Sequence, residues 1–325
     1  MSVSNDQERP VIEADRQTSL SVWRGHRAAA EGSPWADTVH GRRRKNLGLA
    51  KVRDALTTLV LQAAGVYRRG VANAIDVRLS EVEFFFPNLP PGFDGYTILH
   101  LSDIHVGKLA GGVERATALV SGLSVDLAVL TGDVQTRGRP EATEAAGAVA
   151  PLLTAFTARD GILAVLGNHD SHALPAALER LGVRTLINEH AVISRGDASL
   201  HVVGTDDVRY FFTEQAEAVL RRKPAGFVPP GFMIALIHSP ELAGLAARTG
   251  HALYLTGHTH GGQIAFPSGR PVITAALEHA DLASGAWRLE GMAGYTSRGI
   301  GVGRVPCRFN CPGEIPLIRL RRGST

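Results

Sequence analysis

Five short apolar runs end in polar residues, and they dominate the hydrophobic pattern of the chain. They lie within Thr97–His105, Leu127–Asp133, Leu163–Asp170, Met233–His238 and Leu253–His260. A continuous apolar run closed by glycine or polar residues predicts a strand that is buried on both faces. Helical stretches at Val113–Leu123 and Glu141–Ala158 separate the first three runs, with Pro151 expected to kink or split the second. This strand–helix–strand order predicts a parallel sheet with polar side chains at the ends of its strands.

The first 76 residues follow a different pattern. Residues 1 to about 45 are polar and mixed in charge, so we expect a loosely ordered arm with at most one short helix. From there the apolar residues recur every three or four positions, at Leu49, Val52, Leu56, Leu59, Ala63 and Val66. This spacing predicts an amphipathic helix. We therefore divide the chain into a helical, partly disordered extension (1–76) and a main domain (77–325).

Charge is concentrated around this helix. Residues 42–69 hold eight Lys or Arg and one acid, Asp54. The helix either packs on the main domain with a solvated basic face, or lies on an anionic membrane as a peripheral contact. Arg42–Leu47 also resembles a twin-arginine export signal with a cleavage site at Ala72–Ala74, but charges at Lys51, Arg53 and Asp54 interrupt it. We expect a cytoplasmic protein, peripheral at the inner membrane in the second case, rather than an exported one.

Composition excludes several other classes. The net charge is only +3, so we expect no nucleic-acid partner. Two cysteines, Cys307 and Cys311, do not make a disulfide framework in 325 residues, and we expect structural thiols. No stretch of 18 or more apolar residues occurs, so no membrane-spanning helix is predicted.

The residues at the strand ends are typical metal ligands. Asp103 and His105 alternate, as do His258 and His260, so each pair would point to one side of an extended segment. Asp133, Asn168 and His238 add a carboxylate, an amide oxygen and an imidazole. Such a set without cysteine suits Mn²⁺, Fe or Zn²⁺. It is too large for one four-coordinate ion, and a shared carboxylate could join two ions roughly 3.5–4 Å apart.

The blocks resemble the calcineurin-like metallophosphoesterase family in order and spacing. They are Asp103-x-His105, Gly132-Asp133, Gly167-Asn168-His169-Asp170, His238 and Gly257-His258-Thr259-His260. The resemblance implies an α/β fold, a four-layer αββα sandwich, with two divalent metal ions (Mn, Fe or Zn) at the carboxyl edge of its sheets. One ion would be held by Asp103, His105 and His260, the other by Asn168, His238 and His258, with Asp133 bridging. His169 is implied to protonate the leaving oxygen, with Asp170 orienting it.

The flanking motifs resemble one branch of that family. Gly261-Gly262-Gln263 and Thr296–Gly301 are similar to segments of small bacterial phosphodiesterases and of enzymes that split UDP-2,3-diacylglucosamine. The branch implies hydrolysis of phosphodiester or pyrophosphate bonds by a metal-activated hydroxide, on a lipid-linked substrate at the membrane surface or on a soluble one. A non-catalytic metal-binding scaffold is the alternative, and the complete ligand set argues against it.

Three further residues are singled out with their alternatives. Arg298 either contacts the substrate phosphate or forms a structural ion pair. His100 alternates away from Asp103, so we expect it to be a core histidine. His172 follows the Asn168–Asp170 block and either lines the cleft or lies on the surface.

Overall fold

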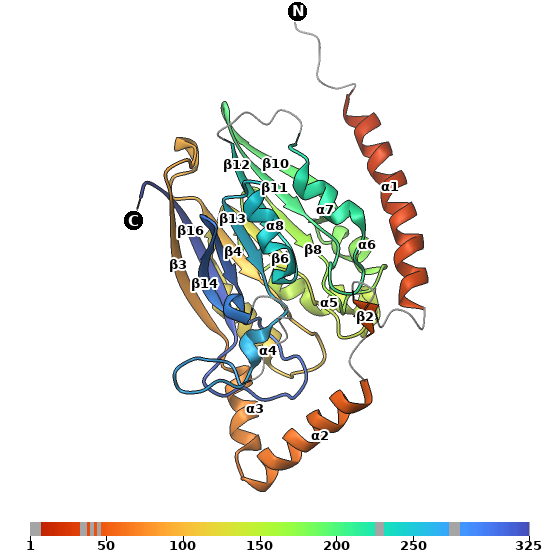
Figure 1. Ribbon diagram of the computed structural model, residues 1–325, viewed down its shortest axis with the longest axis vertical. Coiled ribbons are helices and arrows are strands. Elements are labelled where there is room, and N and C mark those ends of the chain that lie inside the picture. The colour runs from red at the N-terminus through yellow and green to blue at the C-terminus, as the bar shows by residue number, and fades with distance from the viewer. Residues whose placement is uncertain are drawn as a thin grey trace, which may run out of the picture.

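The computed structural model describes residues 8–32, 38–39, 42–43, 47–224, 231–272 and 280–324. Two six-stranded sheets stack face to face between outer helices, as Figure 1 shows, which confirms the predicted four-layer sandwich. The first sheet has the order β3 (Arg78–Phe86), β16 (Glu314–Arg322), β4 (Thr97–Leu101), β6 (Leu127–Thr131), β8 (Ile162–Val165) and β9 (Val183–Thr185). The second has the order β10 (Glu189–Arg195), β11 (Ala198–Gly204), β12 (Phe232–Leu236), β13 (Leu253–Thr256), β15 (Met292–Thr296) and β14 (Gly285–Leu289).

Most of the eight α-helices that the structure describes cover the outer faces of the sheets, and the second of them, α2, projects from the sandwich. The eight helices are α1 (Glu8–Glu31), α2 (Leu47–Ala63), α3 (Tyr67–Ile75), α4 (Gly112–Val120), α5 (Ala142–Leu153), α6 (Leu174–Glu179), α7 (Glu214–Arg221) and α8 (Ala243–Arg248). Short strands pair as β1 (Thr38–Val39) with β2 (Arg42–Arg43), and β5 (Ser124–Val125) with β7 (Thr157–Ala158). Pro151 is tolerated in the last turn of α5, which ends two residues later.

Parallel pairing places the motif ends together, as the sequence pattern predicts. β4, β6, β8 and β9 run parallel in one sheet, and β11, β12, β13 and β15 run parallel in the other. The apolar faces of the two sheets meet in a common core, where Phe86 packs edge-on against Phe232 at a centroid distance of 4.9 Å. Both sheets therefore deliver their carboxyl ends to the same side of the molecule.

The N-terminal extension differs from the expected arm. α1 is a continuous helix of 24 residues that lies along the flank formed by α6 and the second sheet (Figure 1). It is fixed by Arg16, which contacts the Glu179 and Glu189 carboxylates at 3.2 and 3.1 Å, and by the buried residues Leu20 and Arg27. A hydrophobic-periodicity argument misses this helix because polar side chains make most of these contacts.

The interpretation of α2 as a helix packed through its apolar stripe is wrong. Val52, Leu56 and Leu59 are 64%, 57% and 61% exposed, whereas Asp54, Thr57 and Thr58 on the opposite side are half-buried. The helix leaves the sandwich at its lower end in Figure 1. The exposed fractions show that its apolar side is turned to the solvent. Among the described residues, none of the helices has the length and apolar character needed to cross a membrane.

Candidate metal centre

The seven predicted ligands lie at the carboxyl ends of five strands, drawn from both sheets. Asp103 and His105 follow β4, Asp133 follows β6, Asn168 follows β8, His238 follows β12, and His258 and His260 follow β13. Five of them adopt positive φ angles: Asp103 (50°), His105 (47°), Asp133 (56°), His258 (69°) and His260 (52°). Non-glycine residues avoid this left-handed region, and its use costs about 1–3 kcal/mol per residue. The fold thus holds these side chains in a strained backbone conformation, which is typical of a functional site.

The ligand atoms form two groups. Asp103, His105 and His260 make one, and Asp133, His238 and His258 make the other; within each group the atoms lie within 4.8 Å of one another. His105 Nε2 is 3.2 Å from His260 Nε2, which is 3.5 Å from Asp103 Oδ1. In the second group His238 Nε2 is 3.2 Å from His258 Nδ1.

Asp133 lies between the groups. Its Oδ2 is 3.6 Å from His105 Nε2 and 3.2 Å from His238 Nε2. Asn168 follows β8 at the same edge of the first sheet, and its Oδ1 is buried and has no hydrogen-bond partner in the described part of the chain. An orphaned buried acceptor is costly unless a cation or a donor satisfies it. The donor set therefore fits two divalent cations that share one carboxylate.

Burial determines the charge state of the first group. It lowers the pKa of His105 to about 3 and the pKa of His260 well below its ordinary value, so both imidazoles are neutral at pH 7. Neutral imidazole is the form that binds metal ions. Burial raises the pKa of Asp103 to about 6, even though His238 and the hydrogen bond from Ser102 act in the opposite direction.

In the second group the neighbouring charges outweigh burial. Burial lowers the pKa of His238, but the Asp133, Asp103 and Asp207 carboxylates together raise it to about 10. Burial likewise opposes ionisation of Asp133, and His238 offsets this, so the Asp133 pKa lies well below its usual range. The Asp133 carboxylate is therefore ionised at pH 7, and a positively charged group next to it is strongly favoured.

Two glycines allow the close approach of the ligand loops. A Cβ on Gly167 would lie 2.1 Å from Asp133 Oδ1, and one on Gly257 would lie 2.2 Å from Asp103 Oδ2. Real side chains do not tolerate such distances, so the Gly before Asn168 and the Gly before His258 are both required by packing.

His169 lies beside the first group, with ring centroids of His169 and His105 5.1 Å apart. The Arg137 backbone N–H donates to His169 Nδ1 at 3.1 Å. The neutral ring therefore carries its proton on Nε2.

The structure corrects the expected role of Asp170. Its carboxylate accepts hydrogen bonds from the backbone N–H groups of Asp133 (2.8 Å), Gln135 (2.9 Å) and Gly167 (2.8 Å), and none of its described contacts reaches the His169 ring. Burial raises the pKa of Asp170 to about 7, with the Asp133 charge acting in the same direction. Asp170 therefore fixes the loops of Asp133 and Asn168 to one another, and the orientation of His169 comes from a backbone amide that sequence patterns do not reveal.

Arg27 of α1 is a residue that the sequence argument missed. It is 2% exposed, and its Nη2 donates to the carbonyls of Gly167 (3.0 Å) and Asp170 (2.9 Å). Its Nη1 pairs with Asp206, which follows β11 of the other sheet. The guanidinium also stacks over the Phe211 ring, 3.4 Å from its centroid. Arg27 thus connects the Asn168 loop of one sheet with a loop of the other.

The rest of α1 supports this contact. Trp23 Nε1 donates to Asp206 at 2.7 Å, and Glu31 accepts from the His172 backbone N–H and ring Nδ1, both at 2.7 Å. His172 is therefore engaged by α1. Leu20, Trp23, Arg27 and Glu31 fall on one helical face, a spacing that the sequence does contain but that its mixed polarity conceals.

Arg298 forms an ion pair with the buried Glu314, the structural alternative left open by the sequence. Its side chain remains 27% exposed, so contact with substrate stays a prediction. Next to it, the fully buried Arg308 donates to the carbonyls of His260, Arg298 and Gly301 and holds the His260 loop. Cys307 and Cys311 are free and buried, as expected.

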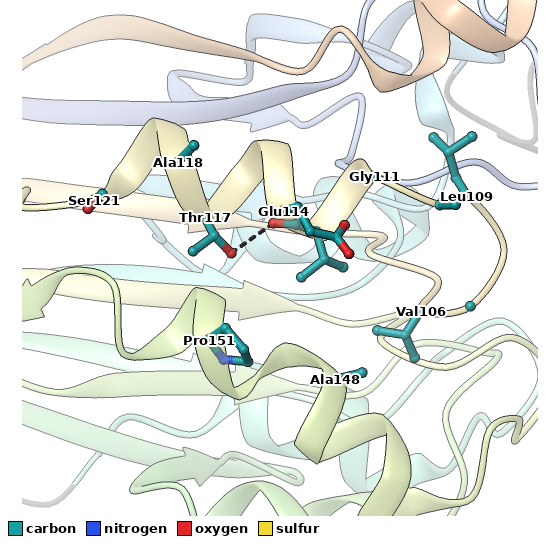
Figure 2. Close-up of a pocket in the computed structure, with 12 residues that line it drawn as sticks. Val106, Leu109, Gly111, Glu114, Thr117, Ala118, Ser121, Ala148 and Pro151 are labelled. Atoms are coloured by element: carbon teal, nitrogen blue, oxygen red, sulfur yellow. Dashed lines mark hydrogen bonds between the residues drawn. The ribbon is translucent and has the colours of Figure 1, made fainter.

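A shallow groove of about 610 Å³ lies between α4 and α5, next to the loop after His105 (Figure 2). Val106, Leu109, Ala148 and Pro151 give it mainly apolar walls, and Glu114 and Thr117 line its α4 side. It contains none of the seven candidate ligands, so the metal centre lies outside it.

Comparison with known proteins agrees with this geometry. The sequence profile described as calcineurin-like phosphoesterase matches residues 96–262. The chain is 30% identical over 240 residues to the uncharacterized metallophosphoesterase YkuE of Bacillus subtilis, covering 72% of this chain and 82% of the relative. It is 26% identical over 247 residues to the phosphodiesterase YaeI of Escherichia coli, covering 73% and 85%. It is also 26% identical over 330 residues to the UDP-2,3-diacylglucosamine pyrophosphatase LpxG of Chlamydia trachomatis, covering 82% and 96%.

Proposed function

Because the chain belongs to the calcineurin-like phosphoesterase family, we propose that it is a two-metal hydrolase of phosphodiester or pyrophosphate bonds. The observation that carries the proposal is the position of Asp133, whose Oδ2 lies between the two ligand groups. One ion would be held by Asp103, His105 and His260, and the other by Asn168, His238 and His258, with Asp133 shared.

The residues of the chain would divide the chemistry among them. Two ions of Mn, Fe or Zn would polarise a phosphoryl oxygen and acidify a water molecule for attack on phosphorus. His169 would donate its Nε2 proton to the leaving oxygen, because the Arg137 amide keeps Nδ1 as the acceptor. Asp170 and Arg27 would hold the loops in place without touching the substrate.

A lipid-linked substrate is the form of the proposal that we favour. The relative from Chlamydia is named as a pyrophosphatase of UDP-2,3-diacylglucosamine, a lipid-linked nucleotide. The apolar groove between α4 and α5 borders the loop that carries His105, so apolar surface lies close to the proposed centre. Soluble phosphodiesters are the second candidate, supported by the relative named as a phosphodiesterase.

The test is hydrolysis of bis(p-nitrophenyl) phosphate after stripping of metals and addition of Mn²⁺, Fe²⁺ or Zn²⁺, with bound metal counted per chain. Asp133→Asn should lose both bound metal and turnover. His169→Gln should keep its metals but lose about 10²–10⁴-fold in turnover, the typical contribution of a general acid. His190→Gln is the matched control, since His190 bonds to the Val219 carbonyl away from the site. A folded, metal-loaded protein that hydrolyses no phosphodiester or pyrophosphate would contradict the proposal.

A further inference from the structure

The side chains of α2 are distributed in the reverse of the usual order. Val52, Leu56, Leu59 and Val60 form one stripe and are all at least 57% exposed. Asp54, Thr57 and Thr58 lie on the other side of the helix and are half-buried. A surface helix normally turns its apolar stripe to the core. We call these four exposed residues the α2 stripe.

The polar side of α2 faces the surroundings of the metal centre. Asp54 Oδ1 is 3.9 Å from Nη1 of Arg304, whose backbone N–H bonds to Gln263 in the loop after His260. Burial raises the pKa of Asp54, and the charges of Arg53, Lys108 and Arg137 oppose this shift. Lys108 follows His105 by three residues, and Arg137 donates to His169. The polar side of α2 thus lies near Lys108, Arg137 and the loop after His260, and the apolar stripe lies on the opposite side of the helix.

Exposed cations lie on α2 itself and on α3, the helix that follows it. Arg53 is 43% exposed, and Arg68 and Arg69 on α3 are exposed and form no ion pair within the described part of the chain. α3 is anchored to the sandwich, because Gly70 packs against the Phe309 ring and accepts a hydrogen bond from Arg308. α2 is therefore followed directly by a helix that is attached to the His260 side of the centre.

We propose that the α2 stripe docks on an anionic lipid bilayer and holds the metal centre at the membrane surface. The choice of a lipid bilayer as the partner rests on the proposed function, since docking would bring the metal centre to a lipid-linked phosphate substrate. Charge decides between occupants: four aliphatic side chains with arginines beside them match the apolar and anionic layers of a lipid surface. The cores of protein interfaces are instead enriched in aromatic residues, and the stripe has none.

The experiment is co-sedimentation of the full chain with vesicles of phosphatidylcholine, with and without phosphatidylglycerol. The wild type should bind the anionic vesicles and dissociate as salt is raised. Leu56→Asp with Leu59→Asp should reduce binding by about tenfold or more, the value of one buried leucine. Arg68→Gln with Arg69→Gln should reduce binding only where phosphatidylglycerol is present, by about fivefold per arginine.

The control separates docking from general surface change. Val192 is 49% exposed on β10, away from α2, so Val192→Asp should bind vesicles like the wild type. Equal binding by the leucine variant and the wild type, or no binding by the wild type, overturns the inference. So does wild-type self-association in sedimentation velocity that the leucine variant abolishes without any vesicle binding, because the stripe would then face a second copy.

The failure of this inference can be told from the failure of the proposed function. Leu56 and Leu59 contact no predicted ligand, so their variant should hydrolyse soluble bis(p-nitrophenyl) phosphate at the wild-type rate. Hydrolysis without vesicle binding refutes only the docking surface, and vesicle binding without hydrolysis refutes only the proposed chemistry.

Discussion

Arg27→Met removes the buried guanidinium that joins the Asn168 loop to the second sheet. The substitution leaves the Gly167 and Asp170 carbonyls without this donor and leaves Asp206, 2% exposed, without its cation. Removal of one partner of a buried ion pair costs about 3–5 kcal/mol. Asp206 keeps hydrogen bonds from Trp23 Nε1 and the Asp207 amide, so we expect the lower end, about 3 kcal/mol of unfolding free energy.

Metal binding should fall as well, because Arg27 supports the loop that presents Asn168. Loss of a residue that orients ligands typically lowers metal affinity by about 10–100-fold. Urea unfolding gives the stability, and isothermal titration with Mn²⁺ gives the affinity of each site. We expect the site that contains Asn168 to weaken more than the other.

Arg24→Met is the matched control on the same helix, since Arg24 is exposed and forms no hydrogen bond or ion pair among the described residues. Arg27→Met combined with Asp206→Leu should recover part of the lost free energy of unfolding, because no buried carboxylate is then left without its cation. Unchanged unfolding and unchanged affinity at both sites in Arg27→Met would refute the positioning role of α1.

Three further predictions concern packing, pH and metal. Gly167→Ala should abolish binding of both ions, because the new Cβ would clash with Asp133. Gly147→Ala on α5 is the control: its Cβ would meet nothing within 4 Å, so the substitution should leave stability unchanged or raise it slightly. Equal metal content in the two variants would contradict the packing argument. Burial lowers the pKa of His100 from 6.5 to about 3. As the pH falls below 6.5, the imidazole of His100 is therefore protonated in the unfolded chain but not in the folded one. The free energy of unfolding contributed by His100 is present above pH 6.5 and is lost as the pH falls toward 3. At pH 4.5 the loss of unfolding free energy is about 2–3 kcal/mol. In chemical denaturation, the unfolding free energy of His100→Gln should therefore depend less on pH than that of the wild type. Metal at 100 times its dissociation constant should add about 2.7 kcal/mol per site to the free energy of unfolding. This should appear as a rise in Tm that EDTA reverses and that Asp133→Asn does not show.

The strand ends could be predicted from sequence because both signals are local. An apolar run that stops at Gly-Asp or Gly-Asn-His-Asp contains the strand and its ligand in one window, as Leu127–Asp133 and Leu163–Asp170 do. Parallel pairing then brings the ends together without further information. The convergence of the candidate ligands within each sheet follows from this pattern, whereas the four layers were implied by the family resemblance.

The remaining contacts depend on partners far away in the chain. Asp170 is held by amides near Asp133, and Arg27 reaches carbonyls 140 residues away, so neither role leaves a local trace. The apolar stripe of α2 was visible, but its direction was not, because periodicity identifies a face without saying what covers it.

The place of β16 in the first sheet has a consequence for synthesis of the protein. β16 lies between β3 and β4, and its Leu317 pairs with Leu99 on one side and Glu81 on the other. As the nascent chain leaves the ribosome, β3 and β4 emerge early, while β16 emerges after the whole second sheet. Until then β4, the strand that leads into Asp103 and His105, exposes an unpaired apolar edge, which is the kind of surface that pairs wrongly or aggregates. The strand order of this fold therefore leaves one edge of β4 unpaired until β16 has been synthesised.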